Sequence, residues 1–235
     1  MPRVPRHLQW SEEACFHLMN RGHNREPVFA DDEDRRAFVG LVARYRDRVG
    51  FRLLHYCLMS NHFHLLVKLP DPRQVSTLMA GLLRAYVHHC HRRHGFVGHR
   101  WQGRFKSPAV QCRDYLLSCG RYIERNPLEA GIVVQPWDYE WSSARVHATG
   151  AADPLVTESA EYHELASQAQ DREERWRGFL LGEDPREQAV RRGDWVIGDD
   201  AFRLQVSEAR GRPMPRGRGR PRKSSKPGQV NFLCN

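Results

Sequence analysis

The apolar positions along the first 150 residues change their period several times, and each period predicts an element. Residues 13–22, EACFHLMNRG, have the length and flanks of a strand that ends in a glycine turn. Residues 31–50 begin with four acids in their first turn and then repeat apolar residues at helical spacing. This segment therefore predicts a helix, with Gly50 as its C-terminal stop.

The next apolar residues fall into two short stretches, FRLLHYCLM and HFHLLVKL, separated only by Ser60 and Asn61. Two such stretches around a two-residue turn predict a β-hairpin. A helical period then returns over about residues 73–94, with apolar side chains on one face. The hairpin and the two helices already indicate a mixed α and β architecture.

Two further elements are expected before residue 130. Residues 104–112, RFKSPAVQC, predict a strand in which Pro108 favours an edge or a bulge, because proline cannot donate to a ladder. Residues 113–126 predict a helix that Pro127 ends.

The element order predicts an α+β fold, a ferredoxin-like antiparallel sheet with helices packed on it, over residues 1–150. Residues 151–208 form an acidic, mainly helical accessory region, with helix expected at about 158–190. Residues 209–235 form a basic tail rich in glycine, proline and arginine, and we expect this tail to be disordered without a partner.

Two histidines stand one residue apart in the second hairpin strand, MSNHFHLLV. Because successive strand side chains alternate, His62 and His64 point to the same side. Two neutral imidazoles on one face can share a divalent metal. Taken alone, however, this short spacing favours an ordinary half-buried strand.

The helix expected at 113–126 carries a matching set of polar residues. Tyr115, Cys119, Tyr122 and Asn126 recur at helical spacing and share one face. If this face meets the histidine strand, Asn126 adds an oxygen ligand and Tyr122 lies beside the metal. A tyrosine hydroxyl can attack a phosphodiester when a metal stabilises the developing charge. The alternative is that Tyr122 simply packs its ring in the core.

The net charge and its distribution along the chain indicate what kind of partner the protein binds. The formal charge is +9, and it is unevenly distributed. Residues 84–125 hold nine Lys/Arg against two acids, residues 210–226 hold eight Lys/Arg and no acid, and residues 151–200 hold thirteen acids against six arginines. Two separate basic regions favour a polyanion such as nucleic acid as the partner.

The motif RWQGRFK, at residues 100–106, interleaves cations with aromatic residues. We expect Arg100, Arg104 and Lys106 to contact phosphates and Trp101 to stack on bases of single-stranded or hairpin DNA. The alternative is an edge strand whose aromatic residues are buried. The set of residues expected to contact DNA is completed by Gln102, Arg121 and Arg125.

The tail segment PRGRGRPRK, at residues 215–223, resembles an AT-hook. In such a peptide, Arg218, Arg220 and Arg222 would enter the narrow minor groove of A·T-rich DNA. A disordered polycation that binds phosphates without sequence preference explains the same composition equally well.

Four segments together resemble a known family. They are NRGHNREPVFADDEDRRAF (20–38), YCLMSNHFHLLV (56–67), RWQGRFKS (100–107) and RYIERNPLEAGIV with WSSA (121–133, 141–144). In this order and spacing they resemble the HUH-class single-tyrosine transposases, in particular the REP-associated tyrosine transposases of bacteria. Ser60 stands where proline is frequent in that family, and His23 stands where asparagine is frequent.

The resemblance implies a role for each residue of the candidate site. His62, His64 and Asn126 would bind the metal, Mg²⁺ or Mn²⁺, and Tyr122 would be the nucleophile, with Tyr115 as the second choice. The enzyme would nick and rejoin single-stranded or hairpin DNA at palindromic repeats through a covalent phosphotyrosine.

Three other functions remain open at this stage. They are a domesticated DNA-binding protein that no longer cuts, an RNA-binding ferredoxin-like module, and a metal hydrolase that uses water as nucleophile. Without a signal peptide or an apolar run of about 20 residues, we expect a cytoplasmic, nucleoid-associated bacterial protein with no membrane contact. It would act as a monomer or a homodimer.

Overall fold

The computed structural model describes residues 14–95, 97–113 and 115–209. The basic tail, with Arg218, Arg220 and Arg222, lies outside these residues. A five-stranded sheet in the order β2-β3-β1-β4-β5 forms the centre of the described fold. Its strands are β1 (Ala14–Arg21), β2 (Arg52–Met59), β3 (His62–Leu69), β4 (Ala109–Val110) and β5 (Val196–Ile197).

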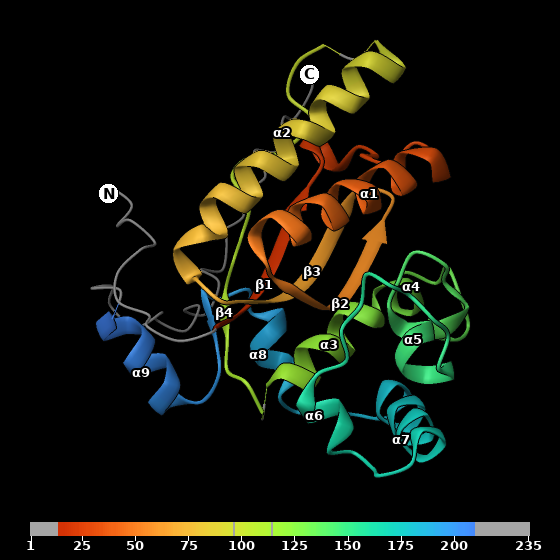
Figure 1. The fold of residues 1–235 in the computed structure, drawn as a ribbon, viewed down its shortest axis with the longest axis vertical. Helices are drawn as coiled ribbons and strands as arrows, with labels where there is room; N and C mark the ends of the chain where they lie inside the picture. The colour runs from red at the N-terminus through yellow and green to blue at the C-terminus, as the bar shows by residue number, and fades with distance from the viewer. Residues whose placement is uncertain (1–13, 96, 114, 210–235) are drawn as a thin grey trace, which may run out of the picture.

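Helices surround this sheet on both sides (Figure 1). The α-helices are α1 (Asp32–Val49), α2 (Val75–His94), α3 (Leu116–Glu124), α4 (Asn126–Glu129), α5 (Ala144–Thr149), α6 (Ala160–His163), α7 (Ala169–Leu181), α8 (Glu187–Arg191) and α9 (Asp200–Ala209). Short 3₁₀ turns are η1 (His23–Arg25), η2 (Pro72–Gln74) and η3 (Pro136–Asp138). The α+β fold class is confirmed.

The first half of the chain follows the sequence prediction closely. The strand, helix, hairpin and helix expected up to residue 94 are all present as β1, α1, β2, β3 and α2. Asp31 caps α1 by accepting a hydrogen bond from the backbone N–H of Asp34. Gly50 ends α1 in the left-handed conformation at φ 76°, which glycine adopts without steric cost.

Three expectations about the second half need correction. The strand predicted at 104–112 is reduced to β4, and it is not at the edge, because β5 pairs with it in parallel. The predicted helix begins only at Leu116, since Arg113 has φ 68° and interrupts it. Pro127 does not end the helical path, because it occupies the first turn of α4, where its missing N–H is not needed.

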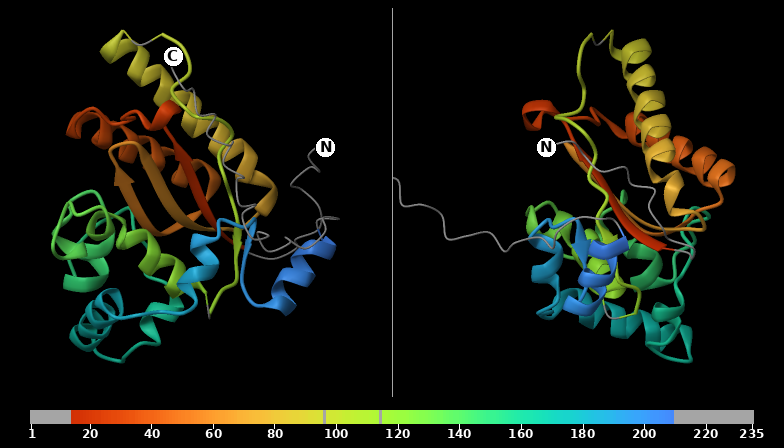
Figure 2. Two further views of the ribbon diagram at one scale, coloured as in Figure 1. Left: turned by 180° about the vertical axis from the view of Figure 1, so that it is seen from behind. Right: turned by 90° about the vertical axis from the view of Figure 1, so that its left-hand side faces the viewer.

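The sheet separates two apolar cores. Helices α1 and α2 cover one face, where Phe16, Phe38, Phe63 and Tyr86 are fully buried. Helix α3 covers the other face, where Leu66, Leu116 and Ile123 belong to a smaller cluster. Figure 2 shows these layers from two further directions. The candidate metal ligands His62 and His64 lie on this second face.

The acidic segment is connected to this second face. Helix α8 lies against α3, and α7 lies against α5 and α3. Strand β5 pairs with β4 in the sheet, where Val196 lies opposite Ala109. The helix expected at 158–190 is divided into three helices, α6, α7 and α8, each of which contacts α3.

Candidate functional site

The strand register brings the histidine pair under α3. In the antiparallel ladders, His64 is opposite Met19 of β1 and Cys57 of β2, while His62 is opposite Arg21 and Met59. Cys57 and Met59 belong to the apolar cluster that α3 covers. His62 and His64 consequently point toward Tyr122 of α3 and Asn126, the first residue of α4.

Hydrogen bonds fix the orientation of His62 and Asn126. Asn61 donates from its Nδ2 to the carbonyl of Arg25, so its Oδ1 must accept from His62 Nδ1, at 2.6 Å. His62 therefore carries its hydrogen on Nδ1, and Nε2 presents a lone pair. Asn126 donates from Nδ2 to the carbonyls of Tyr122 and Ile123, which turns its Oδ1 toward His62 Nε2 at 3.5 Å.

Two acceptor atoms thus face each other, with no hydrogen between them. This arrangement fits a divalent cation that both atoms can bind. Burial lowers the pKa of His62 to about 4, so the ring is neutral near pH 7 and its lone pair is available. The donor set of His62, His64 and Asn126 fits a divalent metal on these grounds.

A third histidine, which sequence analysis did not single out, completes the cluster. His17 of β1 is fully buried, and its Nε2 lies 2.8 Å from Nδ1 of His64. Burial lowers the pKa of His17 to about 3 and that of His64 well below its usual range, so both rings are neutral. The alternation of side chains along residues 14–21 predicts the face of the strand on which His17 lies. Only the β1–β3 register shows that His64 is its neighbour.

Tyr122 lies beside this histidine cluster. Its ring contacts those of His64 and His17 edge to face, with centroids 5.7 and 6.0 Å apart. Burial raises the pKa of Tyr122, and the positive charge of Arg191 opposes this effect. Tyr115 precedes α3 and is half-buried in the apolar cluster. Among the ring contacts of the described residues, none joins Tyr115 to these histidines.

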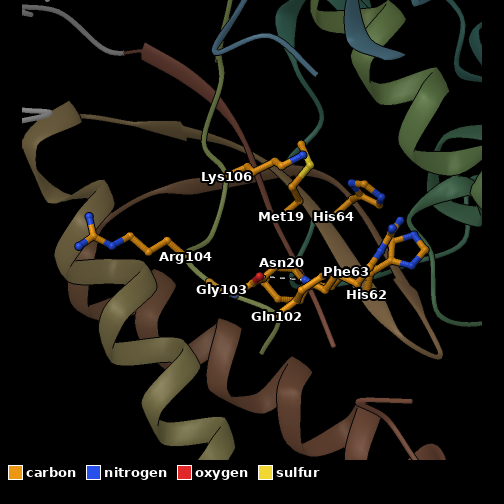
Figure 3. Close-up of a pocket in the computed structure, with 10 residues that line it drawn as sticks. Met19, Asn20, His62, Phe63, His64, Gln102, Gly103, Arg104 and Lys106 are labelled. Atoms are coloured by element: carbon orange, nitrogen blue, oxygen red, sulfur yellow. Dashed lines mark hydrogen bonds between the residues drawn. The ribbon is translucent and has the colours of Figure 1, made fainter. Parts of the chain in front are cut away.

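A pocket of about 430 Å³ opens next to the histidines (Figure 3). Its lining residues include no acid; they are Met19, Asn20, Arg21, His62, Phe63, His64, Gln102, Gly103, Arg104 and Lys106. Lys106 lies next to Met19 and on the side of His64, whereas Arg104 extends away from both histidines. The pocket is therefore suited to an anion that approaches the histidine pair.

The motif at residues 100–106 forms one wall of this pocket as an irregular segment. Isolated bridges join Trp101 to Gly22 and Lys106 to Met19. Gln102, Arg104 and Lys106 are exposed, as a DNA contact requires. Trp101 instead packs its ring on Phe63, at 5.6 Å between centroids, so the expected free stacking surface is largely buried.

Three of the arginines expected to contact DNA donate hydrogen bonds to backbone carbonyls of the protein. Arg121 is only 3% exposed, and its Nε donates to the carbonyl of Phe179, at 2.7 Å. Arg125 donates to the carbonyl of Leu180. Both guanidiniums therefore satisfy the C-terminal carbonyls of α7 and do not reach the pocket. Arg100 similarly donates to the carbonyl of Val28.

A buried carboxylate on the other side of α3 organises a second polar cluster. Glu124 is fully buried and accepts hydrogen bonds from His55, His147 and Ser143 on Oε1 and from Trp176 on Oε2. These favourable contacts outweigh burial and hold the pKa of Glu124 well below its usual range. The carboxylate anion is therefore the form that the fold stabilises.

This second cluster has the residue types of a metal site, with ligand atoms of His55, Glu124 and His147 within 4.8 Å of one another. Its hydrogen bonds indicate a structural role instead. Four donors already satisfy Glu124, and the Nε2 atoms of both histidines have no partner among the described residues. Each ring therefore carries its hydrogen on Nδ1 and donates to Glu124. His55 Nε2 packs directly on Gly120, where a Cβ would lie 2.6 Å away.

Comparisons with known proteins now identify the class. Residues 11–126 match the family described as "Transposase IS200 like". This match covers just under half of the chain and confirms the resemblance of its sequence motifs to the IS200-like transposases. No curated protein matches the chain.

A solved structure gives a more particular likeness. It is described as "Structure of the REP associates tyrosine transposase bound to a REP hairpin", and it aligns with a TM-score of 0.52 at 20% identity. The alignment covers 68% of this chain and 96% of that one. The chain is thus similar in fold to a REP-associated tyrosine transposase. None of the helices in the described ranges is long and apolar enough to span a membrane.

Proposed function

We propose that the protein is a divalent-metal-dependent tyrosine transposase that cuts and rejoins single-stranded or hairpin DNA at palindromic repeats. The observation that carries this proposal is the convergence of His62 and His64 of β3, Tyr122 of α3 and Asn126 of α4 into one cluster. The family match and the hairpin-bound structural neighbour support DNA as the substrate class.

The chemistry assigned to this cluster is a transesterification. The Oη atom of Tyr122 attacks the phosphorus of a DNA phosphodiester and loses its proton, a phosphotyrosine bond forms, and the strand leaves with a free hydroxyl. A bound divalent metal would polarise the phosphate and stabilise its developing charge. A later strand hydroxyl attacks the phosphotyrosine, which restores Tyr122 and rejoins the DNA.

The chain's own residues hold this geometry. His62 presents its Nε2 lone pair because Asn61 accepts the hydrogen on Nδ1. Asn126 is kept in place by its bonds to the carbonyls of Tyr122 and Ile123. Lys106 and Arg104 supply positive charge along the pocket, where a phosphate backbone can lie.

A covalent-adduct assay tests the proposal. Purified protein, Mg²⁺ or Mn²⁺ and labelled hairpin oligonucleotides from repeats near its own gene are mixed and run on a denaturing gel. We expect a protein–DNA adduct that disappears in Tyr122→Phe and His64→Ala and persists in Tyr115→Phe, the matched control. An adduct that persists in Tyr122→Phe and is lost in Tyr115→Phe would assign the other tyrosine. Cleavage without an adduct would indicate a water-using nuclease, and binding without cleavage a domesticated DNA-binding protein.

A further inference from the structure

Helix α8 brings a cation from the acidic segment onto the proposed nucleophile. Figure 1 shows α8 beside α3, although more than 60 residues separate them along the chain. At the end of α8, the guanidinium carbon of Arg191 lies 5.4 Å from the centre of the Tyr122 ring. This separation is within the range of a cation–π contact. Arg191 also lies outside residues 11–126, which match the transposase family.

Two carboxylates hold this guanidinium in place. Arg191 forms ion pairs with Glu129 of α4 and with Glu187 of its own helix. Glu187 is nearly buried and also pairs with Arg121 of α3. The network therefore ties α8 to α3 and to α4 at the level of Tyr122. Ordering a flexible arginine side chain costs conformational entropy. Here Glu129, Glu187 and the Tyr122 ring each contact the guanidinium and fix its position.

Two different parts of the fold contact the Tyr122 ring. The sheet provides the edge contacts with His17 and His64, and α8 provides Arg191. The Arg191 side chain remains 45% exposed, so it borders solvent beside the Tyr122 ring. Its neighbour Arg192 is exposed too, but forms no ion pair among the described contacts.

We propose that Arg191 is a positioning residue for the nucleophile: its guanidinium, fixed by Glu129 and Glu187, holds the Tyr122 ring against the histidine cluster. This inference rests on the proposed function, because it takes Tyr122 as the attacking residue. It assigns to the acidic segment a direct part in the reaction. A one-ångström displacement of a reacting group can cost about 100-fold in rate, so a loose ring would slow the attack without preventing DNA binding.

The test compares Arg191→Gln with Arg192→Gln, which removes the same charge from the next residue. The measured quantities are the first-order rate of adduct formation at saturating hairpin, the hairpin Kd and the melting temperature. We expect Arg191→Gln to lower the rate by about 10- to 100-fold, with Kd within about threefold and an unchanged melting temperature. Arg192→Gln should retain the wild-type rate. Glu129→Gln removes one ion pair of the Arg191 guanidinium but leaves the charge of Arg191 in place. This variant should also lower the rate of adduct formation.

Two results would overturn the proposal. One is a wild-type adduct rate in Arg191→Gln. The other is a loss of rate matched by losses in Kd and melting temperature, which would make Arg191 only a structural residue. An independent readout is the ¹⁹F resonance of 3-fluorotyrosine at position 122, assigned by its absence in Tyr122→Phe. We expect Arg191→Gln to narrow this resonance as the ring gains motion, even if the wild-type protein forms no adduct. An unchanged resonance would exclude the positioning role.

Discussion

His17 Nε2 and His64 Nδ1 lie 2.8 Å apart in a buried contact between β1 and β3. Both rings are neutral because burial lowers both pKa values, so one hydrogen is shared between these two nitrogens. When that hydrogen resides on His64, the Nε2 atom of His64 keeps its lone pair. Metal-binding histidines are usually oriented in this way by a partner on their second nitrogen. We therefore expect His17 to orient His64 for metal binding.

Two substitutions of His17 separate its hydrogen bond from its packing. Leucine fills much of the space but cannot accept a hydrogen, whereas glutamine keeps an acceptor oxygen near the former Nε2. We expect His17→Leu to weaken Mn²⁺ binding by about 10- to 100-fold and His17→Gln to weaken it less. Calorimetric titration with Mn²⁺ alone measures this without DNA. Equal Mn²⁺ affinities in wild type and His17→Leu would contradict the orienting role.

The indole of Trp176 should contribute to the stability of α3 through a single hydrogen bond. Its Nε1 donates to Glu124 Oε2 at 2.8 Å, and both side chains are fully buried. Trp176→Phe keeps an aromatic ring but leaves this oxygen without its donor. We expect a loss of about 1–3 kcal/mol in the free energy of unfolding, measured by urea denaturation.

Trp137→Phe is the control for this substitution. Trp137 packs against the apolar cluster of Ala148, Tyr162, Trp176 and Leu180 but is only partly buried. If both variants lose the same stability, the ring volume and not the hydrogen bond to Glu124 would explain the effect of Trp176→Phe.

Local patterns were sufficient to predict the residues that face one another at the site. The strand period placed His62 and His64 on one side, and the helical period placed Tyr122 one turn before Asn126. The structure brings these two faces together. Both patterns depend only on neighbours in the sequence, which is why they could be found without a fold.

Contacts between distant segments could not be predicted in the same way. His17 approaches His64 through the β1–β3 register, and Arg121 is buried because α7 ends beside α3. From the sequence, Arg121 was one more cation on a basic helix. Its burial depends on unpaired carbonyls nearly 60 residues away, which no local period reveals. The same holds for Arg191 and its contact with Tyr122.

His55, one of the two buried histidines of the second cluster, should make the protein sensitive to acid. Burial and the nearby His147 lower the pKa of His55, although Glu124 opposes this. The unfolded chain has an ordinary histidine pKa of about 6.5. Below that pH the unfolded state binds a proton that the folded state excludes, so stability is present above about pH 6.5 and falls as the pH drops.

His55→Asn isolates this contribution, because the asparagine amide can still donate to Glu124 from near the position of Nδ1. In metal-free protein, the free energy of unfolding should fall less steeply with decreasing pH than in wild type. One proton excluded from the folded state changes this slope by at most about 1.4 kcal/mol per pH unit. Urea denaturation at several pH values measures it. Parallel curves for the two proteins would show that His55 is not held neutral in the folded state.

The pocket cations should control DNA affinity through charge. Lys106 and Arg104 are exposed, line the pocket and precede the tyrosine helix. A lysine or arginine that neutralises one phosphate releases about one counterion, so each contact contributes about one unit to the dependence of log K on log salt. We expect Lys106→Gln and Arg104→Gln each to weaken hairpin binding and to reduce that slope by about one. Fluorescence anisotropy at several salt concentrations measures both quantities.

Arg73→Gln is the matched control, since Arg73 is an exposed cation outside the pocket that pairs with Asp71. It removes the same charge and should leave the salt slope unchanged. Arg121→Gln should behave differently from both, because its guanidinium is buried against the carbonyl of Phe179. For Arg121→Gln we expect a lower melting temperature and an unchanged dependence of log K on log salt. If Arg73→Gln lowered the slope as much as Lys106→Gln, binding would depend on total charge, and the pocket would not be the DNA-binding surface.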